Sequence, residues 1–139
     1  MGELRFIMTE AAPRPIGPYG QGVVAGEFLY TAGQIPLDPA TMTVVAGDIR
    51  VQTERVMQNL AAIVEAAGTS LSHVVKTTCF LATMDDFAAM NEVYSKWFGD
   101  HRPARSAVAA KTLPRNVLIE IDAVALVRPA VSGDSSDGQ

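Results

Sequence analysis

In two segments of the 139-residue chain, hydrophobic residues recur at every third or fourth position. The longer segment runs from Asp48 to Ala67, a period that predicts an amphipathic helix. Asp48 suits the N-cap of this helix, and Gly68 suits the position just beyond its C-terminal end. The second segment runs from about Asp85 to Phe98 and opens with two aspartates, which favour the positive end of a helix dipole. The pattern therefore predicts two helices.

Short runs of β-branched, aromatic and other apolar residues predict strands elsewhere in the chain. These runs are residues 4–8, two runs within 23–33 that meet at Ala25-Gly26, and residues 73–82, 102–110 and 116–127. Between them, "PRPIGPYGQG" and "QIPLDPATMT" carry the turn residues that predict loops. The order is strands, helix, strand, helix and two strands. It indicates an α+β fold whose sheet has both helices on one face.

The last predicted strand is substantially apolar on both sides. One side presents only hydrophobic residues, which are Val117, Ile119, Ile121, Ala123, Ala125 and Val127. The other side mixes hydrophobic residues with two acids and comprises Leu118, Glu120, Asp122, Val124 and Leu126. Because two helices cover only one face of a sheet, we expect another copy of the chain to bury the second face. The sequence thus predicts a homo-oligomer.

Length and composition fit one globular domain. With 48% hydrophobic residues, we expect a single domain over residues 1–130 and a disordered polar tail over residues 131–139. A net charge of −4 without clustered Lys or Arg argues against a nucleic-acid partner. No apolar run approaches the roughly 18 residues that cross a bilayer, and the N-terminus lacks a signal-peptide pattern. We therefore expect a cytosolic protein without a membrane partner.

Residues that bind metals or form disulfides are few. Cys79 is the single cysteine, which excludes an internal disulfide, and its apolar strand predicts a small buried side chain. His73 and His101 are not spaced with further ligands as in zinc sites. The chain also lacks the glycine-rich nucleotide motifs and the GxSxG nucleophile motif. We predict no metal and no other cofactor.

Two predicted strands that otherwise look bound for the interior carry charges, Arg105 in "RPARSAVAA" and Glu120 in "NVLIEIDAVALV". Arg105 shares a strand face with Ala107 and Ala109, whose small side chains leave room for a carboxylate ligand in front of the guanidinium. Alternatively, Arg105 forms a salt bridge with Glu120 or Asp122. Glu120 suits a general acid/base or a water-orienting group. Asp122 lies on the same strand face as Glu120, and the spacing does not decide which of the two acids has this role.

Four further polar or aromatic residues could have either a functional or a structural role. Tyr19 in "IGPYGQG" lies between glycines that permit close approach to a ligand, although such an aromatic residue more commonly covers the core edge. Within the second helix, we expect Tyr94 in the core and Asn91 at a solvated or capping position. Ser106 points to the side of its strand opposite Arg105, and we expect a structural role.

Six segments together resemble the RidA (YjgF) family. They are "IGPYGQGV", "YTAGQIPLDP", "AGDIRVQTERVMQNLAAIVEAAG", "VVKTTCFL", "DDFAAMNEVYSKWF" and "RPARSAVAAKTLPRNVLIEIDAVA". The last segment is the most specific, and the resemblance covers residues 8–128, nearly the whole domain. It implies a chorismate-mutase-like α+β fold, a single mixed sheet with two helices packed on one face. It also implies assembly as a trimer with active sites in the clefts between subunits.

The resemblance implies hydrolysis of 2-imino acids, such as 2-iminopropanoate and 2-iminobutanoate, to 2-keto acids and ammonia. Arg105 would hold the substrate carboxylate, Glu120 would orient or activate the attacking water, and Tyr19 would close the pocket. The remaining implied contacts come from the backbones of Gly33 and Ala107 and from Asn91 at the pocket edge. Because an iminium carbon is already electrophilic, positioning and one proton-transfer group suffice without a cofactor.

Two positions depart from the archetypal members of the family. Ala107 stands where Cys is frequent and Ala32 where Ser is frequent, so the pocket is enlarged and the preferred substrate is an open question. Three alternatives remain beside the imine deaminase. They are a non-catalytic protein that senses small carboxylates, a deaminase for another nitrogenous substrate such as an aminomuconate or carbamate, and the ribonuclease activity attributed to relatives. The acidic composition argues against the ribonuclease.

Overall fold

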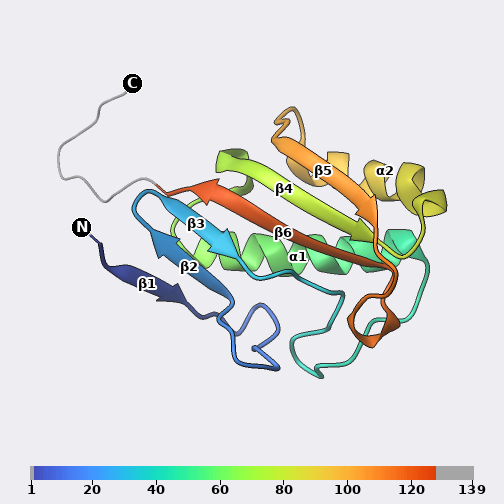
Figure 1. Ribbon diagram of the computed structural model, residues 1–139, viewed down its shortest axis with the longest axis horizontal. Coiled ribbons are helices and arrows are strands. Elements are labelled where there is room, and N and C mark those ends of the chain that lie inside the picture. Colours follow the sequence, from blue (N-terminus) through green and yellow to red (C-terminus); the bar gives the residue numbers. More distant parts are fainter. Residues whose placement is uncertain (1, 128–139) are drawn as a thin grey trace.

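The computed structural model describes residues 2–127, so the tail predicted for residues 131–139 lies outside the described part. Within it, six strands form one sheet in the order β1-β2-β3-β6-β4-β5 (Figure 1). The strands are β1 Leu4–Ile7, β2 Gly22–Ala25, β3 Phe28–Thr31, β4 Val74–Leu81, β5 Ala104–Ala109 and β6 Ile119–Leu126. The helices are α1 Ile49–Ala66 and α2 Phe87–Phe98.

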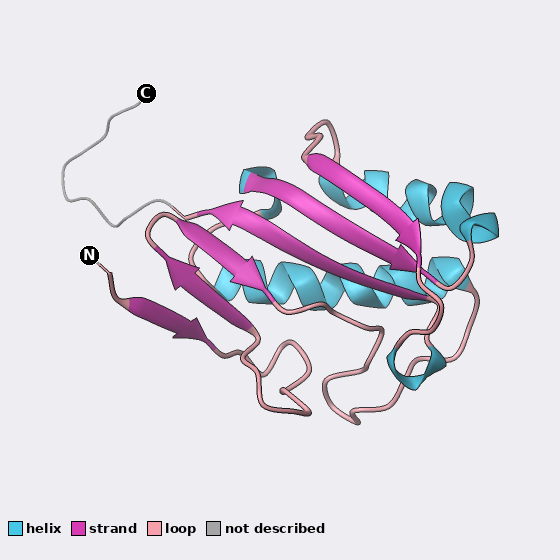
Figure 2. Cartoon of the chain, viewed as in Figure 1, coloured by secondary structure: helices cyan, strands magenta, loops and turns pink. Residues whose placement is uncertain are grey.

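The sheet is mixed, with both helices packed against one face. Neighbouring strands run antiparallel except β4 and β5, which are parallel and connected through α2. Both helices lie behind the sheet in the common view of Figures 1 and 2. The predicted α+β fold is therefore confirmed. No helix within residues 2–127 combines the length and the apolar character needed to cross a membrane.

Helix α1 is bounded by the residues predicted from the sequence, Asp48 before it and Gly68 beyond it. The carboxylate of Asp48 accepts a hydrogen bond from the backbone N–H of Val51, and Gly68 takes the left-handed φ of 92° just beyond the helix. In addition, Nη2 of Arg5 on the edge strand β1 donates to the carbonyl oxygen of Ala67 at 2.9 Å. This cation lies at the negative end of the helix dipole and ties β1 to α1.

The start of α2 lies two residues later than expected. Residues Met84–Asp86 form one turn of 3-10 helix, in which the Thr83 hydroxyl accepts from the backbone N–H of Asp85 at 3.1 Å. The aspartates therefore precede α2 rather than forming its first turn. The side chains that α2 buries are Met90, Val93, Tyr94 and Phe98.

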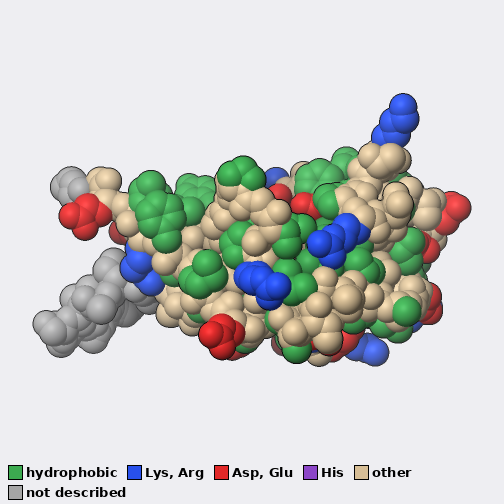
Figure 3. All heavy atoms as spheres, turned by 90° about the horizontal axis from the view of Figure 1, so that it is seen from below, with side chains coloured by type: hydrophobic (Ala, Val, Ile, Leu, Met, Phe, Trp, Pro, Cys, Tyr) green, Lys and Arg blue, Asp and Glu red, His purple; other side chains and the backbone are tan. Residues whose placement is uncertain are grey.

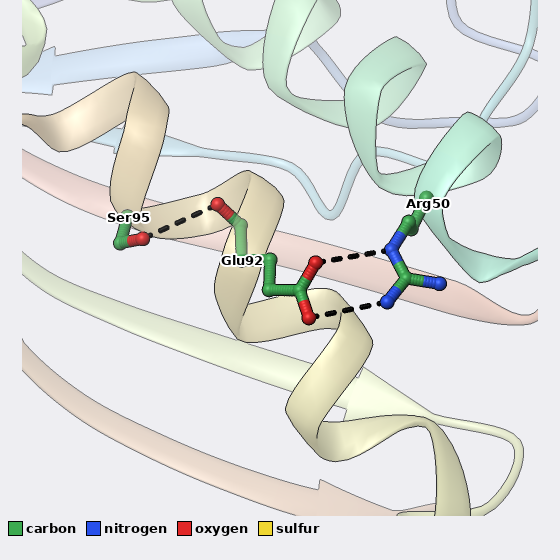
Figure 4. A network of polar contacts seen from close by, with 3 residues as sticks. All are labelled: Arg50, Glu92 and Ser95. Atoms are coloured by element: carbon green, nitrogen blue, oxygen red, sulfur yellow. Dashed lines mark hydrogen bonds and ion pairs between the residues drawn. The ribbon is translucent and has the colours of Figure 1, made fainter.

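Exposed polar side chains connect α1 to α2 (Figure 4). Nε and Nη2 of Arg50 donate to the two carboxylate oxygens of Glu92 at 3.2 and 3.1 Å. The Trp97 indole N–H donates to Glu54 of α1 at 2.9 Å. Hydrogen bonding to Arg50 lowers the pKa of the Glu92 carboxyl. Because Arg50 and Glu92 are both exposed to solvent, their ion pair contributes little to the free energy of unfolding.

The core lies between the helices and the sheet. On β6, Ile119, Ile121, Ala123 and Ala125 are buried in it, while the residues between them are half-buried. The expectation that residues 102–110 run through the interior is wrong for the chain by itself. Residues Ala104–Ala109 form the edge strand β5, whose side chains are all exposed or half-buried. A strand at an edge lacks a neighbour on one side, and local sequence does not reveal that position.

The face of the sheet without helices carries exposed apolar side chains. Phe6 of β1 and Tyr30 of β3 both pair with Val23 of β2 and are 69% and 50% exposed. On β5, Val108 is 47% exposed on the same face. Apolar surface concentrated on one side of a sheet is typical of subunit interfaces. It agrees with the predicted homo-oligomer, which stays a prediction.

Candidate active site

Arg105 and Glu120 point to opposite faces of the sheet. In the strand register Arg105 pairs with Thr77, and Thr77 pairs with Ala123, so these three residues share a face. Glu120 lies three residues before Ala123 on β6 and therefore points to the other face. The chain thus carries two separate clusters of candidate residues, which we name the Arg105 half-site and the Glu120 half-site. The first surrounds Arg105 on the face covered by helices, and the second surrounds Glu120 on the uncovered face.

The Arg105 half-site is built by β5 and α2. Nη1 of Arg105 donates to Oδ1 of Asn91 at 2.7 Å. The guanidinium carbon lies 5.3 Å from the ring centroid of Phe87 and 4.9 Å from that of Tyr94, within the range of cation–π attraction. Asn91, expected to be solvated or capping, instead turns its amide oxygen to the cation. The guanidinium is therefore held by neutral groups.

No carboxylate within residues 2–127 neutralises Arg105, because the one ion pair of this region joins Arg50 to Glu92. Glu120 and Asp122 point to the opposite face of the sheet, so the alternative salt bridge does not form within this chain. Arg105 lines a cavity of about 400 Å³ together with Asn91, Tyr94, Ser95, Arg102 and Pro103. A half-buried cation with free N–H donors beside a cavity is suited to bind an anion.

Ala107 lies two residues beyond Arg105 on the same face and pairs with Cys79 of β4. Cys79 is fully buried, which confirms the prediction for this residue. Burial raises the pKa of its thiol to about 11, so the sulfur is neutral near pH 7 and a poor nucleophile. Ser106 is exposed and points away from the face of Arg105, as expected. In the region 2–127, no three His, Cys, Asp or Glu side chains gather in a way that could hold a metal ion.

The Glu120 half-site is built by β6 and the loop after β3. The backbones of Gln34 and Ile121 exchange hydrogen bonds of 2.8 and 3.1 Å, which hold this loop beside β6. Gly33 lies directly against the Glu120 side chain: a Cβ added to Gly33 would overlap Oε2 of Glu120. The carboxylate therefore rests on a stretch of backbone that carries no side chain.

Glu120 and Gly33 line a cavity of about 320 Å³. Tyr19 lines it too and is 49% exposed. The Tyr19 hydroxyl accepts from the backbone N–H of Ile16 at 3.2 Å, which fixes the ring within its loop. The other lining residues are largely apolar and comprise Pro13, Arg14, Ile16, Gln21, Ala32, Gln34, Ile35, Leu37 and Pro114. This cavity combines one carboxylate with a mainly apolar wall.

The structure separates the two acids of β6. Burial raises the pKa of Glu120, and the nearby carboxylate of Asp122 raises it further. Burial also raises the pKa of Asp122, against the opposing effects of a hydrogen bond to Thr78 and the charge of Lys76. Of the two, Glu120 lines the cavity. A carboxylate with a raised pKa beside a cavity is suited to exchange protons with a ligand.

Three buried amide side chains hold the loops around Glu120, and none of them was singled out in the sequence. Gln21 exchanges hydrogen bonds with the backbone of residues 9–13. Asn59 donates to the carbonyl oxygens of residues 35 and 37, and Gln52 bonds to the backbone of residues 45 and 118. Gln52 and Asn59 are seven positions apart on α1 and interrupt its apolar side, a signal that could have found them.

Comparison with known proteins extends this picture. Residues 9–127 match the family model described as Endoribonuclease L-PSP. A RutC family protein of Pyrococcus horikoshii is 57% identical over 119 residues, which are 86% of this chain and 94% of that protein. A Salmonella typhimurium protein named 2-iminobutanoate/2-iminopropanoate deaminase is 47% identical over 127 residues, which are 89% of this chain and 98% of that protein.

The fold is also shared with solved structures. The crystal structure of Escherichia coli TdcF with bound serine is similar with a TM-score of 0.85 and 42% identity. The similarity covers 89% of this chain and 99% of that one. The sheet, the two helices and these matches define a small α+β protein of the YjgF type. The chain belongs to the RidA (YjgF) family, as its sequence motifs indicated.

Proposed function

We propose that this protein hydrolyses reactive 2-imino acids, and the enamines in equilibrium with them, to 2-keto acids and ammonia. Its substrates would include 2-iminopropanoate and 2-iminobutanoate. The observation that carries the proposal is the Arg105 guanidinium, which neutral groups hold beside a cavity without a carboxylate partner in the described chain. The similarity to the Salmonella typhimurium protein named as a deaminase of these imino acids supports the substrate class.

In this proposal the active site joins the Arg105 half-site of one subunit to the Glu120 half-site of the next. The sheet separates the two side chains within a subunit, so a small substrate cannot touch both of them there. The exposed apolar face that carries Glu120 provides the surface for the neighbouring subunit. A homotrimer with cyclic symmetry then contains three equivalent sites.

The chemistry follows from the two half-sites. Arg105 orients the substrate carboxylate through parallel N–H donors, and Asn91 keeps the guanidinium in place. With the substrate as its iminium form, the Glu120 carboxylate takes a proton from water while the water oxygen bonds to the iminium carbon and the C=N electron pair moves to nitrogen, which gives a neutral carbinolamine. Glu120 then returns the proton to the carbinolamine nitrogen, the C–N bond breaks, and the hydroxyl proton passes to the departing ammonia as the C=O bond forms. One water is consumed, and the products are a 2-keto acid and ammonium.

The other residues of the site have supporting roles in this scheme. Tyr19 closes the cavity, and the backbones of Gly33 and Ala107 contact the substrate. Asn91 lies at the edge of the site through its bond to Arg105. Small residues at Ala32 and Ala107 leave space for side chains larger than those of the archetypal substrates.

The test is to generate imino acids in the assay with an amino acid oxidase or a dehydratase and to follow the release of 2-keto acid. The wild type should accelerate this release. Arg105→Ala should lower kcat/KM by at least about 100-fold, because it removes two charge-assisted hydrogen bonds of roughly 1.5–3 kcal/mol each. Arg105→Lys keeps the positive charge but loses the two parallel N–H donors of the guanidinium. Its kcat/KM should lie between those of the wild type and Arg105→Ala. No acceleration by the wild type with several imino acids would overturn the proposal.

The alternatives predict different outcomes in the same preparations. A sensor of small carboxylates requires Arg105 but not Glu120, so Glu120→Gln would change neither ligand binding nor the response. A hydrolase with Glu120→Gln should still bind a 2-keto acid but lose turnover. A deaminase for another nitrogenous substrate would hydrolyse an aminomuconate or a carbamate faster than the imino acids.

The description of the family model as an endoribonuclease favours a second candidate function. The charge distribution opposes it: the net charge is −4, and on the face shown in Figure 3 the Lys and Arg side chains lie apart from one another among hydrophobic and other uncharged atoms. Incubation with single-stranded RNA should therefore leave the RNA intact.

The expected cytosolic location stays a prediction.

A further inference from the structure

A buried pair of hydroxyl groups lies beside the Arg105 guanidinium. Thr77 is the register partner of Arg105 on β4 and is fully buried. Its Oγ1 lies 2.7 Å from the hydroxyl oxygen of Tyr94, which is 7% exposed. The ring of the same Tyr94 lies 4.9 Å from the guanidinium carbon of Arg105. The two hydroxyls thus join the sheet to the ring that packs on the cation.

The contacts of Arg105 come from one stripe of α2. Phe87, Asn91 and Tyr94 are four and three positions apart, so they lie on one side of the helix. All three contact Arg105, two through their rings and one through its amide oxygen. Phe98 packs on Tyr94 at a centroid distance of 4.7 Å and supports the ring. The side of α2 that packs on the core therefore also contacts the Arg105 guanidinium.

The hydroxyl pair has a specific consequence for the donors of Arg105. A guanidinium carries five N–H donors, and one of them is engaged by Asn91. The Tyr94 hydroxyl bonds to Thr77, and within residues 2–127 the Arg105 guanidinium donates to Asn91 and not to this hydroxyl. At the same time the bond fixes the ring against the sheet, so the cation meets a fixed surface. A long side chain that is already restricted loses less conformational freedom when it binds a ligand.

We propose that Thr77 and Tyr94 are positioning residues for Arg105. Their hydroxyl bond fixes the Tyr94 ring, the ring holds the guanidinium, and the guanidinium is thereby ready to receive a carboxylate. Thr77 is fully buried, and the Tyr94 ring lines the cavity beside the guanidinium that it holds, so both residues act through Arg105. The identity of the carboxylate as a 2-imino acid rests on the proposed function, whereas the positioning role concerns the binding of any small 2-keto acid or imino acid at this site.

The proposal predicts graded effects on ligand binding. Tyr94→Leu removes the ring and should weaken binding of 2-oxobutanoate about 10-fold, the effect of losing a partly desolvated cation–π contact. Tyr94→Phe and Thr77→Val each keep the shape of the side chain and remove its hydroxyl, so each should weaken binding only about 2- to 5-fold. Because the carboxylate is held in both the ground state and the transition state, KM should rise while kcat stays nearly constant.

Calorimetric titration with 2-oxobutanoate measures these effects independently of turnover. The matched control is Thr53→Val, which removes a fully buried hydroxyl that has no partner in the described chain and lies on the other helix. This control should bind 2-oxobutanoate as the wild type does. Thermal unfolding identifies any variant with altered folding, and the double variant Thr77→Val/Tyr94→Phe removes both hydroxyls without leaving either one unpaired.

Rescue by free guanidinium tests the aromatic contact directly. Arg105→Ala should lose binding of 2-oxobutanoate, and guanidinium chloride at millimolar concentration should restore part of it. The rescue should disappear in Arg105→Ala/Tyr94→Leu, a result that a purely structural role for Tyr94 does not predict.

Wild-type affinity and KM in Tyr94→Leu and Thr77→Val would overturn the positioning role, whether or not imines are hydrolysed. Guanidinium rescue that is unchanged by Tyr94→Leu would also overturn it. If the wild type bound 2-oxobutanoate and these variants weakened it, but no imine were hydrolysed, the positioning role would be supported and the proposed function overturned.

Discussion

The carboxylate of Glu120 rests against the backbone of Gly33. A Cβ added to Gly33 would overlap Oε2 of Glu120 and lie 2.9 Å from its Cδ, closer than such atoms approach in proteins. Gly33 does not adopt a left-handed φ, so its φ angle is not the reason for a glycine at this position. The glycine is therefore required for the space that it leaves to the Glu120 carboxylate.

Gly33→Ala should lower imine hydrolysis while the fold persists. The added methyl group displaces a half-buried and flexible carboxylate, which costs little stability but moves the proton-transfer group. A misplacement of this size should reduce kcat/KM by about 10- to 100-fold with an unchanged melting temperature. Gly20→Ala is the matched control, because the nearest atom to its Cβ would be 4.0 Å away. Wild-type kcat/KM in Gly33→Ala would contradict the role of this contact.

The pH dependence of activity should report Glu120. Burial, with a further contribution from Asp122, raises its pKa, and the carboxylate form is the one that accepts a proton from water. Activity should therefore fall as the pH falls through this raised pKa, above the range of an ordinary glutamate. Asp122→Asn removes the neighbouring negative charge and should shift the acidic limb of the kcat/KM profile to lower pH. An acidic limb that does not move would contradict the assignment.

Thr53→Val should stabilise the protein. The Thr53 hydroxyl is fully buried in α1 and has no hydrogen-bond partner within residues 2–127. Replacing this hydroxyl with a methyl group of similar size removes an unpaired buried polar group, which is worth about 1 kcal/mol or more in the free energy of unfolding. Urea denaturation measures the change. A loss of stability of similar size would show that the hydroxyl is needed.

Elements defined by local patterns could be predicted from the sequence. Asp48 and Gly68 mark the ends of α1 because caps depend on the residues next to the helix. The buried and half-buried sides of β6 follow from simple alternation. The exposure of β5 could not be predicted in this way, because it depends on the position of the strand at the sheet edge.

The arrangement of the site was predictable only in part. The resemblance selected Arg105 and Glu120, but their opposite faces depend on the register of β5 with β4 and of β4 with β6. Such pairings join residues far apart in the sequence, so alternation within one strand does not determine them. The spacing likewise left Glu120 and Asp122 equivalent, whereas the loop that carries Gly33 lies against only Glu120.

Mixed oligomers test the composite site most directly. Arg105→Ala and Glu120→Gln each disable one half-site, and both homo-oligomers should be inactive. When the two variants are co-expressed with different tags and assemble at random, half of the subunits supply an intact Arg105 and half supply an intact Glu120. Half of one half, or roughly a quarter of the sites, then contains both intact residues. Purification through both tags removes the homotrimers, and every mixed trimer contains one fully intact site of three, so the account predicts about a third of wild-type imine hydrolysis in purified mixed trimers. Mixed oligomers as inactive as either parent would contradict it.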